Sequence, residues 1–169
     1  GGAEALMHRA MGGILDKITD MTLFLNPTEQ SYSRLGAHKA PKYISWSSNN
    51  RSQLIRVPAA SGEYRRFELR SPDCTANPYL AFALIINAGL DGVEAREELP
   101  APSVGMSKLA LPSSLESAIN LAEKSEFIKS IIPEKLFESY ICHKRQELEL
   151  SKRSDEIKLA TDHKYFEIL

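Results

Sequence analysis

Apolar residues recur at helical spacing near the start of the chain and at strand-like spacing further along. Leu6, Ala10 and Ile14 follow one another every four residues, which predicts a helix over residues 3–19. Residues 21–25 are apolar and fit either a short strand or the tail of that helix. Three strand-length segments bounded by Asn, Pro and Ser-Gly follow, at residues 43–47, 53–57 and 64–70. We expect these strands in one sheet, with the last two forming an antiparallel pair across residues 58–62.

The second half of the chain is predicted to be mainly helical. Asn77 followed by Pro78 is a typical helix start, because Asn accepts from the first free amides and Pro fits the first helical position. The helix over residues 79–90 is apolar on nearly every face, so we expect it to be buried. Residues 94–112 are predicted to be a loop. Further helical segments are expected after the N-cap candidates Ser113, Ser125 and Thr161, and from Pro133 to about residue 152.

The strand predicted over residues 64–70 carries an unusual set of charges. At a period of two, Tyr64, Arg66, Glu68 and Arg70 lie on one face. Two arginines around one carboxylate are costly to bury unless they meet an anion and a cation, such as a phosphate and a metal ion. The alternative interpretation is a solvated face with a ladder of ion pairs. Arg56 lies within apolar residues 54–57, where an unpaired guanidinium group is also expensive.

Composition narrows the possible functions without identifying one. The 169 residues are 43% hydrophobic and 25% charged, which is ordinary for one globular domain with a proper core. A net charge of −1 gives no electrostatic reason to expect nucleic acid or an anionic membrane as a partner. Two cysteines and four isolated histidines show no metal-ligand spacing. No apolar run has spanning length and no signal peptide is recognisable, so we expect a cytoplasmic protein.

Five ordered motifs resemble the C-terminal catalytic domain of glutamine synthetase. They are Asn26-Pro27-Thr28, Ser31-Tyr32-Ser33-Arg34-Leu35, Ala40-Pro41-Lys42-Tyr43-Ile44-Ser45-Trp46-Ser47, Asn50-Arg51-Ser52-Gln53-Leu54-Ile55-Arg56-Val57-Pro58, and the Glu68 strand with the Asn77 helix. The resemblance is dense over residues 5–92 and thinner beyond. It implies an α+β fold in which an antiparallel β-sheet segment packs with helices. Residues 1–169 then form a single-domain fragment, with the active-site sheet and helices in 1–92 and a helical region in 93–169.

The resemblance implies a glutamate–ammonia ligase that uses ATP and Mg²⁺ or Mn²⁺. In this family ATP phosphorylates the γ-carboxylate of glutamate, and ammonia then attacks the γ-glutamyl phosphate. Family members are homo-oligomers, and they carry an N-terminal β-grasp domain and a first catalytic half that we expect to precede Gly1. That absent part holds most of the metal ligands, so we expect the chain by itself to be inactive.

The resemblance also assigns roles to single residues. Arg34 and Arg70 resemble the arginines that contact the substrate glutamate, and Glu68 resembles a glutamate that ligates the metal ion nearer the nucleotide. The arginines that resemble those of the ATP site are Arg51, Arg56 and Arg66. Arg51 is in addition a catalytic candidate.

Two positions depart from the family pattern. Lys39 stands where most members carry an acid in a flap that shields the acyl phosphate and helps deprotonate ammonium; a charged lysine cannot accept that proton. Glu63 falls where the ATP site usually has a lysine. Residues 94–112 show no counterpart of the tyrosine loop that some bacterial members adenylylate. Two alternatives therefore stay open: a γ-glutamyl ligase for another amine, and a non-catalytic regulatory paralogue.

Overall fold

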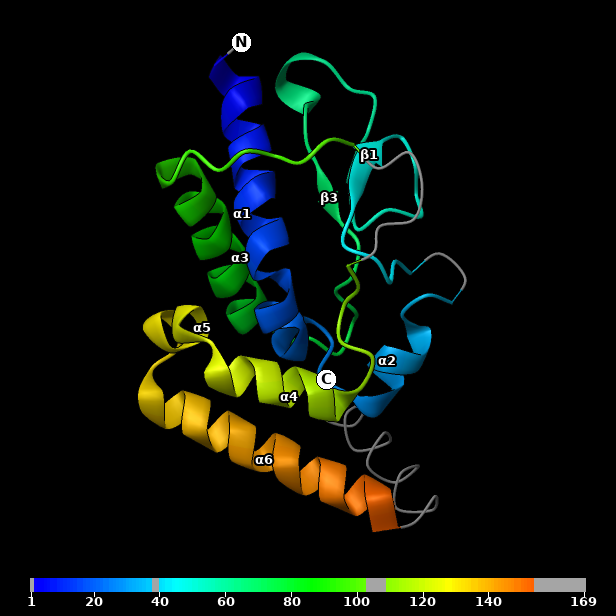
Figure 1. Ribbon diagram of the computed structural model, residues 1–169, viewed down its shortest axis with the longest axis vertical. Helices are drawn as coiled ribbons and strands as arrows, with labels where there is room; N and C mark the ends of the chain where they lie inside the picture. The colour runs from blue at the N-terminus through cyan, green and yellow to red at the C-terminus, as the bar shows by residue number, and fades with distance from the viewer. Residues whose placement is uncertain (1, 38–39, 103–108, 154–169) are drawn as a thin grey trace.

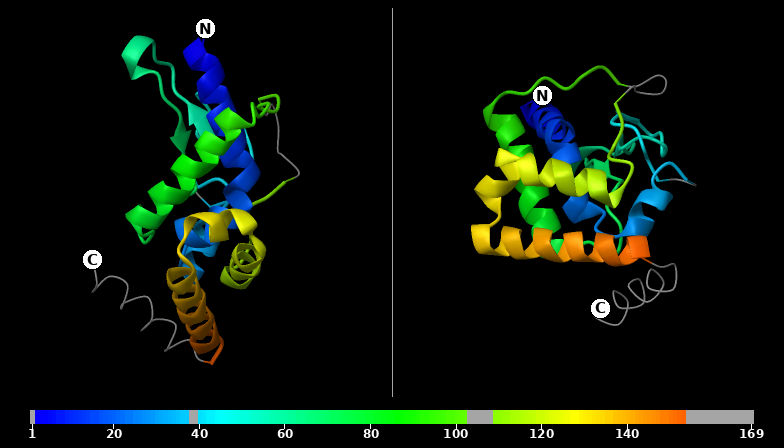
Figure 2. Two further views of the ribbon diagram at one scale, coloured as in Figure 1. Left: turned by 90° about the vertical axis from the view of Figure 1, so that its left-hand side faces the viewer. Right: turned by 60° about the horizontal axis from the view of Figure 1, so that its bottom comes forward.

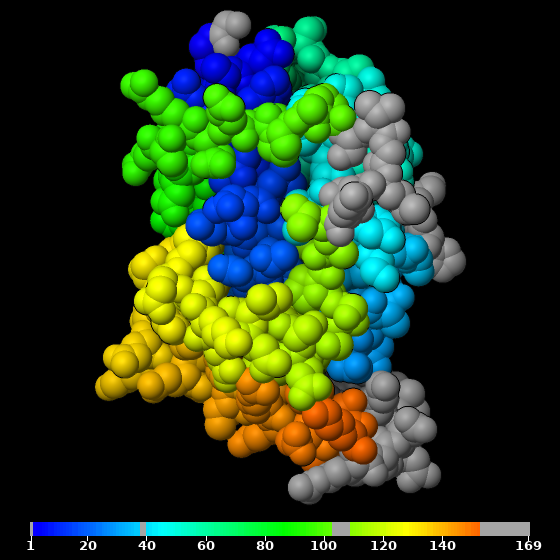
Figure 3. Space-filling view, in the orientation of Figure 1, coloured from blue at the N-terminus to red at the C-terminus, as the bar shows by residue number. Residues whose placement is uncertain are grey.

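A long first helix forms the centre of the structure, a computed structural model that describes residues 2–37, 40–102 and 109–153. Helix α1 (Gly2–Leu25) is buried over most of its second half. Residues 21–25 are the end of this helix, where Met21, Leu23, Phe24 and Leu25 are almost completely enclosed. Helix α3 (Pro78–Glu94) packs along α1, and Figure 3 shows α1 surrounded by α3, the strand region and α4. No described helix is both long and apolar enough to cross a membrane.

The backbones of α1 and α3 touch where two glycines meet. A Cβ atom built on Gly13 would lie 2.2 Å from the carbonyl oxygen of Ala88 and 2.7 Å from Cα of Gly92. Neither position has room for a side chain. Glycine at both positions therefore allows the close approach of the two helices.

The small sheet has the strand order β1-β2-β3, with β1 at Trp46–Ser48, β2 at Ile55–Val57 and β3 at Glu68–Leu69. The antiparallel pairing predicted for the last two strands is confirmed. The first two strands are parallel, so the sheet is mixed rather than wholly antiparallel within an α+β fold. Asn49, whose φ is 64°, follows β1 directly, and residues 49–54 form the connection between the two parallel strands.

The strands are shorter than the sequence predicts. Only Glu68–Leu69 of residues 64–70 is a strand, because a 3₁₀ turn at Gly62–Tyr64 comes first. Gly62 has a φ of 62°, which a glycine adopts easily, and the Arg65 amide donates to its carbonyl oxygen. Tyr43 lies outside β1 and forms an isolated antiparallel bridge with Ala110.

The described C-terminal helices are α4 (Leu115–Lys124), α5 (Glu126–Ile131) and α6 (Glu134–Arg153), and a short α2 (Glu29–Arg34) follows α1. Ser125 caps α5 as predicted, whereas α4 is capped by Ser114 rather than Ser113, through a capping box with Ser117. Helix α6 begins after Pro133 as predicted. The Thr161 cap lies outside the described residues.

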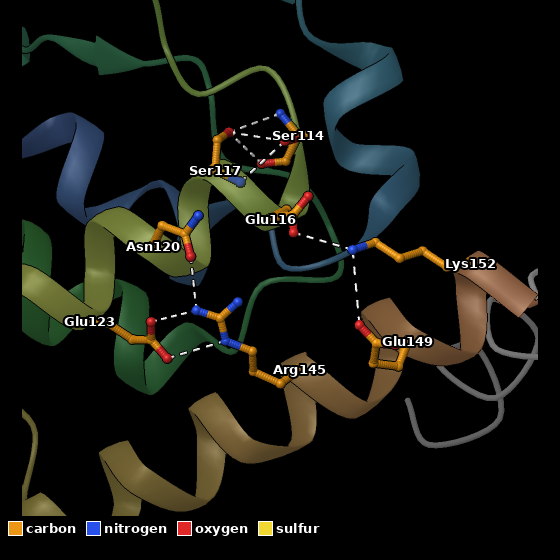
Figure 4. A network of polar contacts seen from close by, with 8 residues as sticks. All are labelled: Ser114, Glu116, Ser117, Asn120, Glu123, Arg145, Glu149 and Lys152. Carbon is orange, nitrogen blue, oxygen red and sulfur yellow. Dashed lines mark hydrogen bonds and ion pairs between the residues drawn. The ribbon is translucent and has the colours of Figure 1, made fainter.

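Ion pairs hold α6 against α4 (Figure 4). Arg145 on α6 contacts both Glu123, at 2.5 Å, and Asn120, at 2.8 Å, on α4. Lys152 on α6 bonds Glu116 of α4 at 3.2 Å. The hydrogen bond to Glu123 raises the pKa of Arg145, so this contact stays charged.

The expectation that the helix over residues 79–90 is buried is wrong for one face of α3 in the described structure. Its buried residues, including Leu84 and Ala88, face α1. Tyr79, Phe82 and Ile86 are all more than half exposed on the other side. Seen from that side, α3 lies in front of α1 with no described element over it (Figure 2, left).

Candidate functional site

Arg56 and Glu68 form an ion pair across the middle of the sheet. They are direct partners in the β2–β3 register, so both side chains leave the same face. Arg56 Nη1 lies 2.9 Å from Glu68 Oε2 and 3.2 Å from Oε1. The Arg56 side chain is 17% exposed and that of Glu68 34%. Arg56 therefore fixes the direction of the Glu68 carboxylate.

A second arginine approaches the same carboxylate from the solvent side. Arg66 Nη2 lies 3.9 Å from Glu68 Oε1, and the Arg66 side chain is 58% exposed. The sequence predicted a carboxylate between Arg66 and Arg70. Among the described residues the two arginines paired with Glu68 are instead Arg66 and Arg56. Arg56 takes the place that was expected for Arg70 because it is the cross-strand partner of Glu68 on β2.

Ser47, on β1, lies next to the Arg56–Glu68 pair in the sheet. It is the parallel register partner of Arg56, as Glu68 is the antiparallel one. The Ser47 hydroxyl is buried and has no hydrogen-bond partner among the described residues. Sequence reasoning did not single out Ser47, because its place beside Arg56 depends on a parallel register that the pattern does not show.

Arg34 and Asn26 join the segment after β3 to the first two helices. Arg34, the last residue of α2, donates a hydrogen bond from Nη2 to the Ser71 carbonyl oxygen. The Nδ2 group of Asn26, which follows α1 and is fully buried, donates to the same oxygen at 2.8 Å. Because Ser71 lies two residues after the end of β3, Arg34 lies close to the segment that follows Glu68 and contains Arg70. The structure therefore brings Arg34 close to this part of the site.

Three of the predicted site arginines have buried guanidinium nitrogens without a partner among the described residues. They are Arg34 Nε, Arg56 Nε and Arg70 Nη1. An unsatisfied buried donor costs about 1–3 kcal/mol, and more for a charged group. Carboxylate and phosphate oxygens are the acceptors that best match guanidinium groups. These nitrogens therefore fit anionic ligands.

Two predicted residues are not brought into this cluster by any described contact. Arg51 is exposed in the turn between β1 and β2 and makes no hydrogen bond or ion pair within residues 2–37, 40–102 and 109–153. Lys39 lies outside the described residues. The roles predicted for both remain predictions.

The described residues do not build a metal site by themselves. No group of three or more His, Cys, Asp or Glu side chains in the described part of the chain is arranged to hold a metal ion. Glu68 supplies one carboxylate, and Arg56 already neutralises it. Oxygen-rich sites for Mg²⁺ normally combine one or two carboxylates with water and substrate phosphates.

Tyr32 is a buried neutral group close to Arg34. Burial raises the pKa of its phenol, and the neighbouring Tyr140, Asp73 and Glu29 shift it in the same direction. The Tyr32 hydroxyl has no hydrogen-bond partner among the described residues. It therefore stays protonated at neutral pH and contributes no charge to the site.

Comparison with known proteins gives concordant results. Residues 2–160 match a family model described as the glutamine synthetase catalytic domain. The glutamine synthetase of Methanosarcina mazei is 41% identical over 150 residues, covering 81% of this chain and 34% of that protein. That of Thermotoga maritima is 42% identical over 144 residues, covering 78% and 33%.

A solved structure is similar over most of the described fold. It is described as a GmaS/ADP complex, with a TM-score of 0.77, 28% identity, and coverage of 89% of this chain and 37% of its own. The chain thus spans about a third of the length of the curated relatives that it matches.

Proposed function

The chain belongs to the glutamine synthetase family, and we propose that it forms the C-terminal part of the catalytic domain of an ATP-dependent glutamate–ammonia ligase. The observation that carries this proposal is the set of three site arginines with unpartnered buried nitrogens, one of which, Arg56, is paired with Glu68. In the proposed arrangement, residues 1–92 carry the active-site sheet and helices, and residues 93–169 form a helical region. The complete protein is proposed to be a homo-oligomer, as the family resemblance implies.

Arg34 and Arg70 are proposed to hold the substrate glutamate. Arg34 donates a hydrogen bond to the carbonyl oxygen of Ser71, which directly follows Arg70, so α2 is joined to the segment that carries Arg70. Each keeps one buried nitrogen free of partners among the described residues. Two guanidinium groups can bind a carboxylate and restrict its orientation, which places the reacting γ-carboxylate.

Arg51, Arg56 and Arg66 are proposed to hold the phosphates of ATP. In the first step a γ-carboxylate oxygen attacks the γ-phosphorus, and ADP leaves. In the second, the nitrogen of ammonia attacks the acyl carbon, and inorganic phosphate leaves. Fixed guanidinium groups stabilise the negative charge on the transferring phosphoryl group. Arg56 is the best anchored of the three, because Glu68 and the strand hold it in place.

Glu68 is proposed to be one ligand of a Mg²⁺ or Mn²⁺ ion. Such an ion would neutralise phosphate charge when bound. The described residues offer one carboxylate rather than a complete site, so the other ligands would come from polypeptide that this chain does not span.

Lys39 favours a second candidate function, the γ-glutamylation of an amine other than ammonia. A lysine ammonium in the flap would repel ammonium and could not accept its proton. A non-catalytic paralogue is the third candidate. Both differ from glutamine synthesis in their response to the acceptor amine, which can be measured directly.

The experiment that tests the proposal is a chimera. Residues 2–160 replace the matching segment of the Methanosarcina mazei glutamine synthetase, and ATP-dependent formation of γ-glutamyl hydroxamate from glutamate and hydroxylamine is measured. We expect the chimera to be active and the 169-residue chain alone to be inactive. Circular dichroism and size-exclusion chromatography verify that both proteins are folded.

A further inference from the structure

Helix α3 presents an apolar stripe to solvent. Tyr79, Phe82, Ile86 and Leu90 are 85%, 63%, 56% and 53% exposed. Their spacing of three and four residues places them on one face of the helix. Side chains of this size and exposure leave an apolar patch on the order of 500 Å², which is near the upper limit for a typical monomer.

The stripe lies opposite the face that packs on α1. The buried residues Ala81, Leu84 and Ala88 belong to the α1 side. Figures 1 and 2 show α3 at the edge of the described structure, with α1 on one side only. The chain thus has a helix with one face in the core and a second apolar face without a described neighbour.

The composition of α3 is that of a helix enclosed on both sides. Residues 78–90 contain no charged side chain, and the first charges are Asp91 and Glu94 at the end of the helix. A helix with one solvated face normally carries charged residues on it. Interfaces between independently folded subunits also have a polar rim, whereas obligate interfaces resemble a domain core cut in half. The stripe resembles the second case.

We propose that this stripe is the docking surface for the part of the glutamine synthetase catalytic domain that the chain does not span. The relatives are about three times as long as the region matched, and the similar solved structure contains this fold within 37% of its chain. Those proteins therefore have the additional polypeptide that can cover α3. The inference rests on family membership and not on the proposed ligase activity.

The first test is complex formation in trans. The 169-residue chain is co-expressed with the remainder of the Methanosarcina mazei glutamine synthetase, meaning that protein without the matched segment. We expect a one-to-one complex by size-exclusion chromatography with light scattering. The double variant Phe82→Glu and Ile86→Glu should raise the dissociation constant at least roughly 100-fold, because buried aromatic anchors dominate such interfaces.

Leu121→Glu is the matched control, because Leu121 is an exposed leucine on α4, at 38% exposure. It should leave binding unchanged. Both variants replace exposed side chains, so their unfolding midpoints in urea should match that of the wild type. Binding that survives the α3 double variant overturns the proposal. So does a homodimer of the chain that the α3 variant disrupts when no complex with the remainder forms.

A second test does not require a soluble remainder. Phe82→Cys is made in a Cys74→Ser, Cys142→Ser background, in the 169-residue chain and in the chimera. Alkylation at position 82 is followed by mass spectrometry. We expect labelling in the chimera to be at least roughly tenfold slower than in the chain alone, while Leu121→Cys reacts equally in both. Equal rates at position 82 would show that the remainder does not cover α3. Neither test requires turnover, so its failure is distinct from failure of the ligase proposal.

Discussion

Arg56 Nη1 lies 2.9 Å from Glu68 Oε2, and the two residues are direct cross-strand partners of β2 and β3. The guanidinium group is largely buried, and its Nε atom has no partner among the described residues. Glu68 therefore compensates a cation that would otherwise be poorly solvated. The same contact holds the carboxylate where the proposed metal and phosphates would bind.

Replacing Glu68 should destabilise the folded chain, because the buried Arg56 guanidinium then loses its counter-charge. We expect Glu68→Gln to lower the free energy of unfolding by about 1–3 kcal/mol, because it leaves a buried cation without its counter-charge. Arg66→Gln is the comparison, since Arg66 is 58% exposed and 3.9 Å from Glu68. Its loss should cost less than about 1 kcal/mol. Urea denaturation measures both, and equal losses would contradict a special role for the Arg56–Glu68 pair.

The contact between α1 and α3 should tolerate no side chain at its centre. We expect Gly13→Ala to destabilise the chain by about 3 kcal/mol or more, because its Cβ would overlap the Ala88 carbonyl oxygen. Gly89→Ala is the control on the same helix pair, where the nearest atom to a new Cβ is 3.6 Å away. It should be neutral or stabilising by up to about 1 kcal/mol. Thermal unfolding of both variants checks the order.

Local sequence signals predicted where some of the helices begin. Asn77 and Pro78 mark the start of α3, and Ser125 caps α5, because capping depends on residues only three positions away. The antiparallel pairing of β2 and β3 followed from two apolar segments and a Pro-to-Gly turn. The position of Arg34 beside the Glu68 strand came from the family resemblance and could not have come from spacing.

Features that depend on distant parts of the chain were not predictable. The parallel register that places Ser47 beside Arg56 has no local signal. The turn at Gly62 shortened the predicted strand, and the register between β2 and β3 placed Arg56, rather than Arg70, beside Glu68. The apolar pattern of α3 predicted a buried helix, but it did not show that one face lacks a described neighbour.

Tyr32 should make the chain less stable in alkaline solution. Burial raises the pKa of Tyr32 above its ordinary value of 10.0, so the folded chain keeps a proton that the unfolded chain loses. The contribution of this tyrosine to the free energy of unfolding is therefore fully present below pH 10. Above pH 10 the free energy of unfolding falls by about 1.4 kcal/mol per pH unit for each such tyrosine. Tyr140, whose pKa burial also raises, contributes in the same direction.

Tyr32→Phe should remove one of these two contributions and so reduce the slope of stability against pH above pH 10. Its effect at neutral pH should be small, because the hydroxyl has no partner among the described residues. Urea unfolding at several alkaline pH values gives the slope. An unaltered slope in Tyr32→Phe would show that Tyr32 ionises in the folded chain.

Lys39 should limit the use of ammonia by the chimera. We expect Lys39→Glu to raise the ammonia-dependent rate roughly 10²-fold or more, the usual contribution of a general base. The rate with hydroxylamine should change little, because that amine is already neutral near neutral pH. Lys42→Glu controls for added negative charge nearby. Strong ammonia-dependent synthesis with Lys39 that falls in Lys39→Glu would contradict the assignment of Lys39 to the flap.

Hydroxamate formation by the chimera, with and without Arg56, tests directly whether this chain supplies phosphate-binding arginines to an ATP-dependent glutamate ligase. We predict activity that requires both ATP and glutamate and that is absent from the 169-residue chain alone. Arg56→Ala should lower it by roughly 10²-fold or more through lost phosphate stabilisation. A folded chimera that forms no γ-glutamyl hydroxamate, or one whose activity is unaffected by Arg56→Ala, would contradict it.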